Sequence, residues 1–173
     1  MRSLIGLGFL TALAACTSIG EVPTKRLASV TLKNANGLPA GTAQLLAAGD
    51  KARLTIAAVG LGKGQHGVHL HAVGQCEAPG FTSAGGHLNP GAREHGADNP
   101  RGKHLGDLPN LTVSDAGVGS LVAELPGTSA EIEAALFDAD GSALVIHAAP
   151  DDYRTDPSGN SGARIACGVL VRK

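Results

Sequence analysis

Apolar and polar residues alternate along much of the chain, with the two-residue period of strands that bury one face. In ASVTLKN, residues 28–34, the first, third and fifth positions are apolar and the positions between them are polar. Gly, Asn-Gly or Asp-Gly turns separate many of the further short apolar runs, which are TAQLLAAGD, ARLTIAAVGL, GVHLHAV, GSLVAEL, SALVIHA and ACGVLVRK. This pattern predicts an all-β sandwich or barrel.

Two long segments do not fit a strand pattern, and a third stretch has two interpretations. The segments run from about Cys76 to Asp107 and over residues 150–163, and both are rich in Gly, Pro and polar residues. Loops of that length in a compact domain usually carry function. Residues 131–136 fit either a strand or a helical turn, because Thr128 and Glu131 match a capping box.

The N-terminus has the pattern of an export signal. The apolar run LIGLGFLTALAA follows Arg2 and is too short to span a bilayer. LAAC, residues 13–16, resembles the lipobox of bacterial lipoproteins, which predicts lipidation of Cys16; ordinary cleavage to a soluble secreted protein is the alternative. We therefore expect a signal peptide over residues 1–16, a tether over 17–27 and one folded domain over 28–173, in the periplasm or cell envelope.

Composition narrows the class of protein further. The chain has 173 residues, 25 Gly and a formal net charge of −1, without a basic cluster that could follow a phosphate backbone. Nucleic acid is therefore not an expected partner.

The cysteines suggest one disulfide. If Cys16 carries lipid, Cys76 and Cys167 remain as a pair in an oxidising compartment. A disulfide between them would close a loop of about 90 residues, worth roughly 4–5 kcal/mol in the chain-entropy model; metal ligation by one or both is the alternative.

Histidines are the main candidates for chemistry. In a strand, His69 and His71 of GVHLH point to the same side, with Cα atoms about 6.7 Å apart, opposite the core-facing Val68 and Leu70. Two imidazoles so placed can bind one metal ion from two sides. A half-exposed polar strand face is the simpler interpretation of this motif alone.

The rest of the histidine inventory favours a metal site. One Gly- and Pro-rich loop holds His87, His95, His104 and Asp107, and three imidazoles with one carboxylate form a reasonable tetrahedral zinc set. His147 lies in a separate apolar strand, from which it could meet His69 and His71 across the sheet. A solvated loop and a structural strand histidine are the alternatives.

Five blocks, in order, closely resemble the copper/zinc superoxide dismutases, and above all their exported bacterial branch. They are GVHLHAVGQC, GGHLNP, REHGADNPRGKHLGDLPNL, LVIHAAPDD and GNSGARIACGV. The resemblance covers residues 28–173. It implies a Greek-key β-sandwich or flattened barrel of about eight antiparallel strands with two long functional loops.

The resemblance also implies a role for each residue that matches a family motif. Copper would be held by four histidines and zinc by three histidines and one aspartate, with one copper and one zinc per subunit and His87 shared as a bridge. Arg164 would guide the substrate and Asp151 would link a copper histidine to a zinc histidine. Cys76 and Cys167 would form the disulfide. The implied copper ligands are His69, His71, His87 and His147, and the implied zinc ligands are His87, His95, His104 and Asp107.

The implied activity is the conversion of superoxide to dioxygen and hydrogen peroxide, with His87 moving a proton. Two other hypotheses are a copper or zinc carrier on the same fold and an envelope lipoprotein whose histidines only buffer metal. A carrier could dispense with Arg164 or His87, and this chain keeps both. His66 matches no ligand and is expected to be a polar residue at a strand entry. We expect contact with the membrane only through the lipid. A homodimer is possible.

Overall fold

The structure, a computed structural model, describes residues 24–173, so the expected signal peptide, Cys16 and most of the tether lie outside the described residues. Its two helices are η1, a 3-10 turn (Thr82–Ala84), and α1 (Ser129–Leu136). Its strands are β1 (Thr24–Asn34), β2 (Pro39–Ala48), β3 (Lys51–Val59), β4 (Gly64–His66), β5 (Val68–His71), β6 (Leu111–Val113), β7 (Val118–Leu125), β8 (Ala143–His147), β9 (Arg164–Val169) and β10 (Val171–Arg172).

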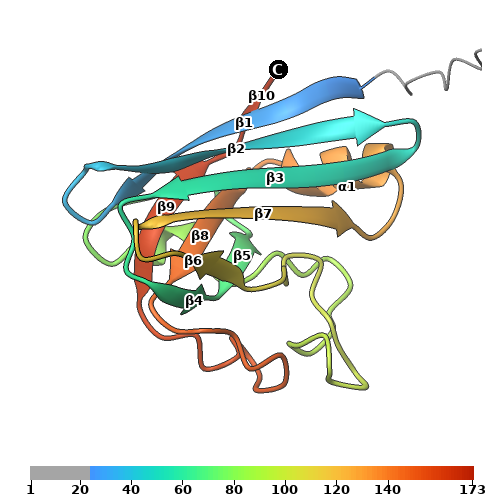
Figure 1. Ribbon diagram of the computed structural model, residues 1–173. Helices are drawn as coiled ribbons and strands as arrows, with labels where there is room; N and C mark the ends of the chain where they lie inside the picture. Colours follow the sequence, from blue (N-terminus) through green and yellow to red (C-terminus); the bar gives the residue numbers. More distant parts are fainter. Residues whose placement is uncertain (1–23) are drawn as a thin grey trace, which may run out of the picture.

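The strands form one antiparallel sheet that curls into a nearly closed, flattened barrel (Figure 1). The order is β4-β6-β7-β3-β2-β1-β9-β8-β5, and β10 pairs with β1. The first and last strands of this order, β4 and β5, are separated in the chain only by Gly67, so the two ends of the sheet meet. The predicted all-β class is confirmed. Gly67 and Leu170 each interrupt one longer strand, which reconciles these strands with the expected count of about eight.

The alternation of apolar residues places one side of each long strand in the barrel interior. Along β3 the burial follows the sequence strictly, with Ala52, Leu54, Ile56 and Ala58 buried and the residues between them more exposed. The same interior contains buried side chains from the other strands, including Val30, Leu32, Leu45, Leu70, Leu111, Leu125, Leu144 and Ile146. Removal of this apolar surface from water is the main favourable contribution to folding.

The stretch with two interpretations forms a helix. Thr128 caps α1: its hydroxyl accepts a hydrogen bond from the Glu131 backbone N–H, and the Glu131 carboxylate accepts one from the Thr128 backbone N–H. This reciprocal pair is the capping box that the sequence suggested. Ile132 and Leu136 then face the core.

The two long connections that the sequence predicts are present, and both project from the same part of the barrel (Figure 1). One joins β5 to β6 and includes η1; the other joins β8 to β9. At the other end of the chain, β1 begins at Thr24 and so includes residues that the sequence analysis assigned to the tether. Among residues 24–173, no helix is both long and apolar enough to cross a membrane.

The first long connection is ordered because it hydrogen-bonds to β5. Leu70 donates its backbone N–H to Gly106 O at 2.9 Å and accepts from Leu88 N at 2.8 Å. Leu88 and Leu108 bury their side chains in the core, beside the candidate ligands His87 and Asp107. A side chain at Gly106 would collide with the Leu70 carbonyl, so only glycine fits there.

Candidate metal centre

His69 and His71 project from the same side of β5, away from the barrel interior, as the strand period predicts. This side is not exposed, because the long connections cover it: His69 is 0% and His71 is 1% exposed. The interpretation of a half-exposed polar strand face is therefore wrong. The two imidazoles are buried polar groups, and buried polar groups need partners.

His147 and His87 complete a group of four imidazoles around this position. His147 ends β8, which pairs with β5, and its ring centroid lies 4.8 Å from that of His69 and 5.8 Å from that of His71. His87 comes from the first connection, which forms a β-bridge with His71. Its ring stacks on His69 at 3.9 Å and lies edge-on to His71 at 5.0 Å. The expected meeting across the sheet is thus observed.

The chain holds one nitrogen of three of these rings and leaves the other nitrogen free. His71 Nδ1 lies 2.9 Å from Gly85 O, and His147 Nδ1 lies 3.1 Å from Gly162 O. His69 Nε2 lies 2.7 Å from the Asp151 carboxylate. Such contacts fix the tautomer and the orientation of each ring.

The remaining nitrogens converge without a partner. Donor atoms of the four histidines lie within 4.8 Å of one another. Within the described part of the chain, the atoms with no hydrogen-bond partner include His69 Nδ1 and the Nε2 atoms of His71, His87 and His147. Unpaired buried nitrogens are costly unless an ion binds them, and a set of four imidazoles suits copper. These residues therefore fit a copper ion.

A second set of donors meets at Asp107. Its Oδ1 lies 3.0 Å from the Nδ1 atoms of His87 and His95 and 3.1 Å from that of His104. His87 Nδ1 and His104 Nδ1 are 3.4 Å apart. Ligands at about 2.0 Å from a tetrahedral zinc ion are separated by about 3.3 Å. The four residues thus fit zinc; His69 is also within 4.8 Å of part of this group, but its Nε2 is bonded to Asp151.

Asp151 connects the two sets. Its Oδ2 lies 2.7 Å from His69 Nε2, and its Oδ1 lies 3.0 Å from His95 Nε2, with all three side chains buried. Gly159 of the second connection packs directly on this carboxylate, where a Cβ would collide with Asp151 and approach His95. Asp151 thus contacts one histidine of each set, and its role as a link between a copper ligand and a zinc ligand stays a prediction.

Burial and ion pairing give the groups different charges in the metal-free state. Burial lowers the pKa of His71 to about 2, of His147 to about 3 and of His87 to about 4, so these rings are neutral. For His95, burial also lowers the pKa, but hydrogen bonds to Asp107 and Asp151 outweigh it and raise the pKa to about 9. Burial opposes ionisation of Asp107, yet hydrogen bonds from His87 and His95 hold its pKa well below the usual range.

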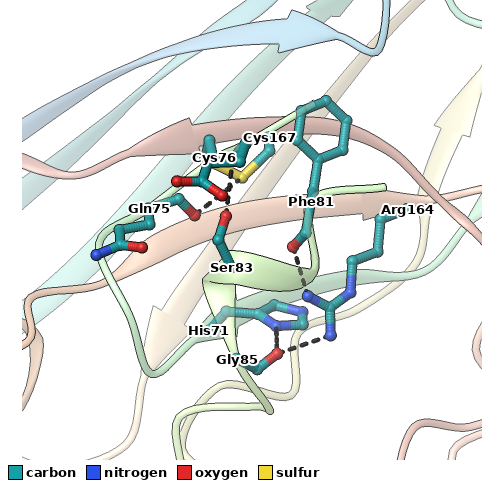
Figure 2. Close-up of a disulfide and its surroundings, with 9 residues drawn as sticks. His71, Gln75, Cys76, Phe81, Ser83, Gly85, Arg164 and Cys167 are labelled. Carbon is teal, nitrogen blue, oxygen red and sulfur yellow. Dashed lines mark hydrogen bonds between the residues drawn. A yellow bond between two sulfur atoms is a disulfide. The ribbon is translucent and has the colours of Figure 1, made fainter. Parts of the chain in front are cut away.

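Arg164 lies at the entrance to the four-imidazole group. It lines a cavity of about 440 Å³ together with residues that include His71, His87, His147, Asn89 and Ser158. Its guanidinium donates to Phe81 O at 2.6 Å and to Gly85 O at 2.7 Å (Figure 2). Cys76 and Cys167 form the expected disulfide beside these contacts, which excludes metal ligation by either one.

Sequence reasoning missed two residues that support the centre. His66, expected to be a polar residue at a strand entry, is 5% exposed, with Nδ1 2.8 Å from His147 O and Nε2 2.9 Å from Gly62 O. Asn110 holds the backbone of Asp151 through both of its amide atoms. The contacts with His147 and Asp151 leave no signal in the sequence, because in both the partner is a backbone group of a residue distant in the chain.

The fold and site define a class of protein: an antiparallel β-barrel with two adjacent groups of candidate metal ligands that have His87 in common. A family model described as copper/zinc superoxide dismutase (SODC) matches residues 39–170. The chain belongs to the copper/zinc superoxide dismutase family.

Individual relatives agree with this assignment. The chain is 40% identical over 142 residues to "Superoxide dismutase [Cu-Zn] 2" of Aquifex aeolicus, with 80% of this chain and 83% of that protein covered. It is 50% identical over 107 residues to a superoxide dismutase-like protein of Bacillus subtilis, a match that covers 61% of this chain and only 55% of that protein. A crystal structure of a SOD-like protein from Bacillus subtilis superposes with a TM-score of 0.78 at 41% identity, covering 85% of this chain and 100% of that one.

The metal-free protein is expected to be most stable near pH 6.5. As the pH falls below 6.5, unfolded His71, His87 and His147 take up protons while the folded rings stay neutral, so the free energy of unfolding decreases. As the pH rises from 6.5 through about 9, folded His95 loses the proton that its carboxylate partners stabilise, and stability decreases again. Calorimetry of the metal-free protein across this range measures the effect. A transition temperature that rises steadily as the pH falls below 6.5 would contradict it.

Proposed function

We propose that this protein is an exported superoxide dismutase that binds one copper and one zinc ion and converts superoxide to dioxygen and hydrogen peroxide. One observation carries the proposal: four buried imidazoles present unpaired nitrogens to a common point, and one of them also belongs to the Asp107 set. We assign copper to His69, His71, His87 and His147, and zinc to His87, His95, His104 and Asp107. Family membership supports both assignments.

When bound, copper supplies one-electron exchange between two oxidation states, and zinc supplies a fixed positive charge without redox chemistry. Two superoxide anions and two protons give one dioxygen and one hydrogen peroxide, so the chain must supply anion binding and proton delivery. His87 is placed for the second task, because its Nδ1 faces Asp107 while its Nε2 has no partner among the described residues. Its Nε2 can hold a proton and release it while the Nδ1 side keeps the ring in place.

Arg164 is placed for anion binding. Its guanidinium lines the same cavity as His71, His87 and His147, whose low pKa values leave them uncharged. The arginine is therefore the positive group among these lining side chains. A fixed cation in a cleft attracts small anions and accelerates their arrival in a salt-dependent manner.

Activity of the copper- and zinc-loaded protein tests this proposal. We expect His147→Ala to abolish activity, because it removes a copper donor. Arg164→Ala is expected to lower kcat/KM roughly tenfold and to flatten its dependence on ionic strength, with metal content unchanged. The measurements are superoxide consumption against salt concentration and metal analysis of each variant.

The outcome that would contradict the enzyme is a wild-type protein with both metals bound and no activity. That result would favour the alternative of a copper or zinc carrier. Intact metal binding with identical activity in wild type and Arg164→Ala would reject the assigned role of the arginine alone.

We further propose export to the periplasm or cell envelope, with anchoring through a lipid on Cys16. The Cys76–Cys167 disulfide supports an oxidising compartment, and the matched relatives are bacterial. The LAAC sequence supports the anchor. Membrane contact would then be confined to the lipid.

Cys16→Ser is expected to move the protein from the membrane fraction to the soluble fraction while dismutase activity per molecule stays the same. Cell fractionation and the mass of the mature N-terminal peptide measure this. A wild-type peptide that carries no lipid would contradict the anchor and would favour ordinary cleavage.

An uncharged area on the barrel supports the proposal of a homodimer. Val59, Val118 and Val122 are 43%, 48% and 60% exposed on the neighbouring strands β3 and β7. Val59 and Val118 belong to an area without charged residues that also includes Ala57 and Ser120. Such an area does not repel a second copy of itself, and exposed apolar area favours association.

Val118→Asp is expected to convert the dimer to a monomer, because each copy would bring a like charge to the contact. Val171→Asp is the matched control, since Val171 is 54% exposed but lies on β10, away from this area. Sedimentation velocity at several protein concentrations distinguishes the two variants. A wild-type protein that stays monomeric at every concentration would contradict the proposal.

A further inference from the structure

The carbonyl groups that hold Arg164 belong to a short turn, and the side chain that anchors this turn is Phe81. Phe81 O and Gly85 O accept the guanidinium hydrogen bonds at 2.6 and 2.7 Å (Figure 2). These residues flank η1, in which Ala84 N donates to Phe81 O and Gly85 N donates to Thr82 O. The two acceptors are thus fixed relative to each other by the turn itself.

The Phe81 ring attaches this turn to the barrel. The ring is 2% exposed and packs in a small apolar cluster separate from the main core, with Val145 of β8 and Cys167 of β9. The backbone of Phe81 is left-handed, with φ of 54°, a conformation that is uncommon for a residue with a large side chain. Ring burial therefore holds the residue in a backbone conformation that it would otherwise disfavour, and this conformation directs its carbonyl oxygen to Arg164.

The disulfide is a second attachment of the same segment, but it lies farther from the carbonyls. Cys76 precedes Phe81 by five residues, and the intervening chain is connected through the Glu77 N to Ser83 Oγ hydrogen bond at 2.8 Å. Cys167 contributes to the cluster that receives the Phe81 ring. The residue that places a carbonyl directly on the guanidinium is Phe81, not either cysteine.

We infer that Phe81 is a positioning residue for Arg164: its buried ring sets the carbonyl groups that aim the guanidinium at the anion-binding cavity. This inference rests on the proposed function of Arg164 and adds a residue that has no contact with substrate or metal. It predicts that loss of the ring weakens anion binding through Arg164 while the metal ligands remain in place.

The test compares Phe81→Gly with wild type, since glycine tolerates the left-handed backbone and removes only the ring. Azide affinity of the copper- and zinc-loaded protein, followed by visible absorption, is expected to fall about tenfold, which corresponds to about 1.4 kcal/mol. Phe81→Leu keeps an apolar side chain and is expected to restore most of the affinity. In an Arg164→Ala background, Phe81→Gly is expected to have no further effect, because residues that act through one group are not additive.

Phe137→Gly is the matched control, because Phe137 is a partly buried aromatic residue that packs on the main core under Arg172, in another part of the fold. It is expected to lower the unfolding temperature without change in azide affinity.

Azide binding requires no turnover, so the result is independent of whether the protein is a dismutase. Unchanged azide affinity in Phe81→Gly, or an equal loss in the Arg164→Ala background, would overturn the inference. Should Phe81→Gly not fold, Phe81→Ala, which also removes the ring, takes its place, and wild-type azide affinity in Phe81→Ala would overturn the inference as well.

Discussion

The two ligand sets keep one arrangement because a single carboxylate holds an imidazole from each. Asp151 accepts from His69, which belongs to the barrel, and from His95, which belongs to a long connection. Burial of a carboxylate is costly unless its oxygens are paired, so both contacts stabilise the ionised side chain. The backbone of Asp151 is held in turn by Asn110, and its side chain also accepts from Tyr153 N. The rigid strand thereby determines where a loop histidine lies.

Backbone pairing with β5 explains how such long connections can be ordered at all. The segments on either side of His87 and before Asp107 hydrogen-bond to β5 and to each other, in effect extending the sheet. Ligands alternate with anchors there: Leu88 and Leu108 enter the core next to His87 and Asp107. Burial of the leucines offsets part of the entropy lost in ordering the loop, which is of order 1–2 kcal/mol per residue for the backbone. The leucines thus help to hold the candidate ligands in one arrangement.

The sequence predicted the features that depend on the two-residue period of a strand or on the residue types that bind metals. Strand alternation placed His69 and His71 on one face, and the histidine-rich loop indicated a second set around Asp107. It did not predict burial of the first pair, because burial depends on which segments cover a face. The strands β4 and β6 are too short to show a period, and neither appeared among the expected strands. His66 and Asn110 contact backbone atoms of residues far along the chain, and no pattern of residue types records that.

The Gly85 carbonyl illustrates how one backbone atom can connect metal binding with anion guidance. It lies 2.9 Å from His71 Nδ1, which leaves His71 Nε2 free, and it also accepts from the Arg164 guanidinium at 2.7 Å. Both contacts end on one oxygen, so Gly85 O fixes the ring of a proposed copper ligand as well as the guanidinium, whereas Phe81 O contacts the guanidinium alone. The turn is fixed by the Phe81 ring on one side and by the disulfide on the other. These two attachments keep Gly85 O in place, where it fixes the tautomer of His71 and the direction of the Arg164 guanidinium.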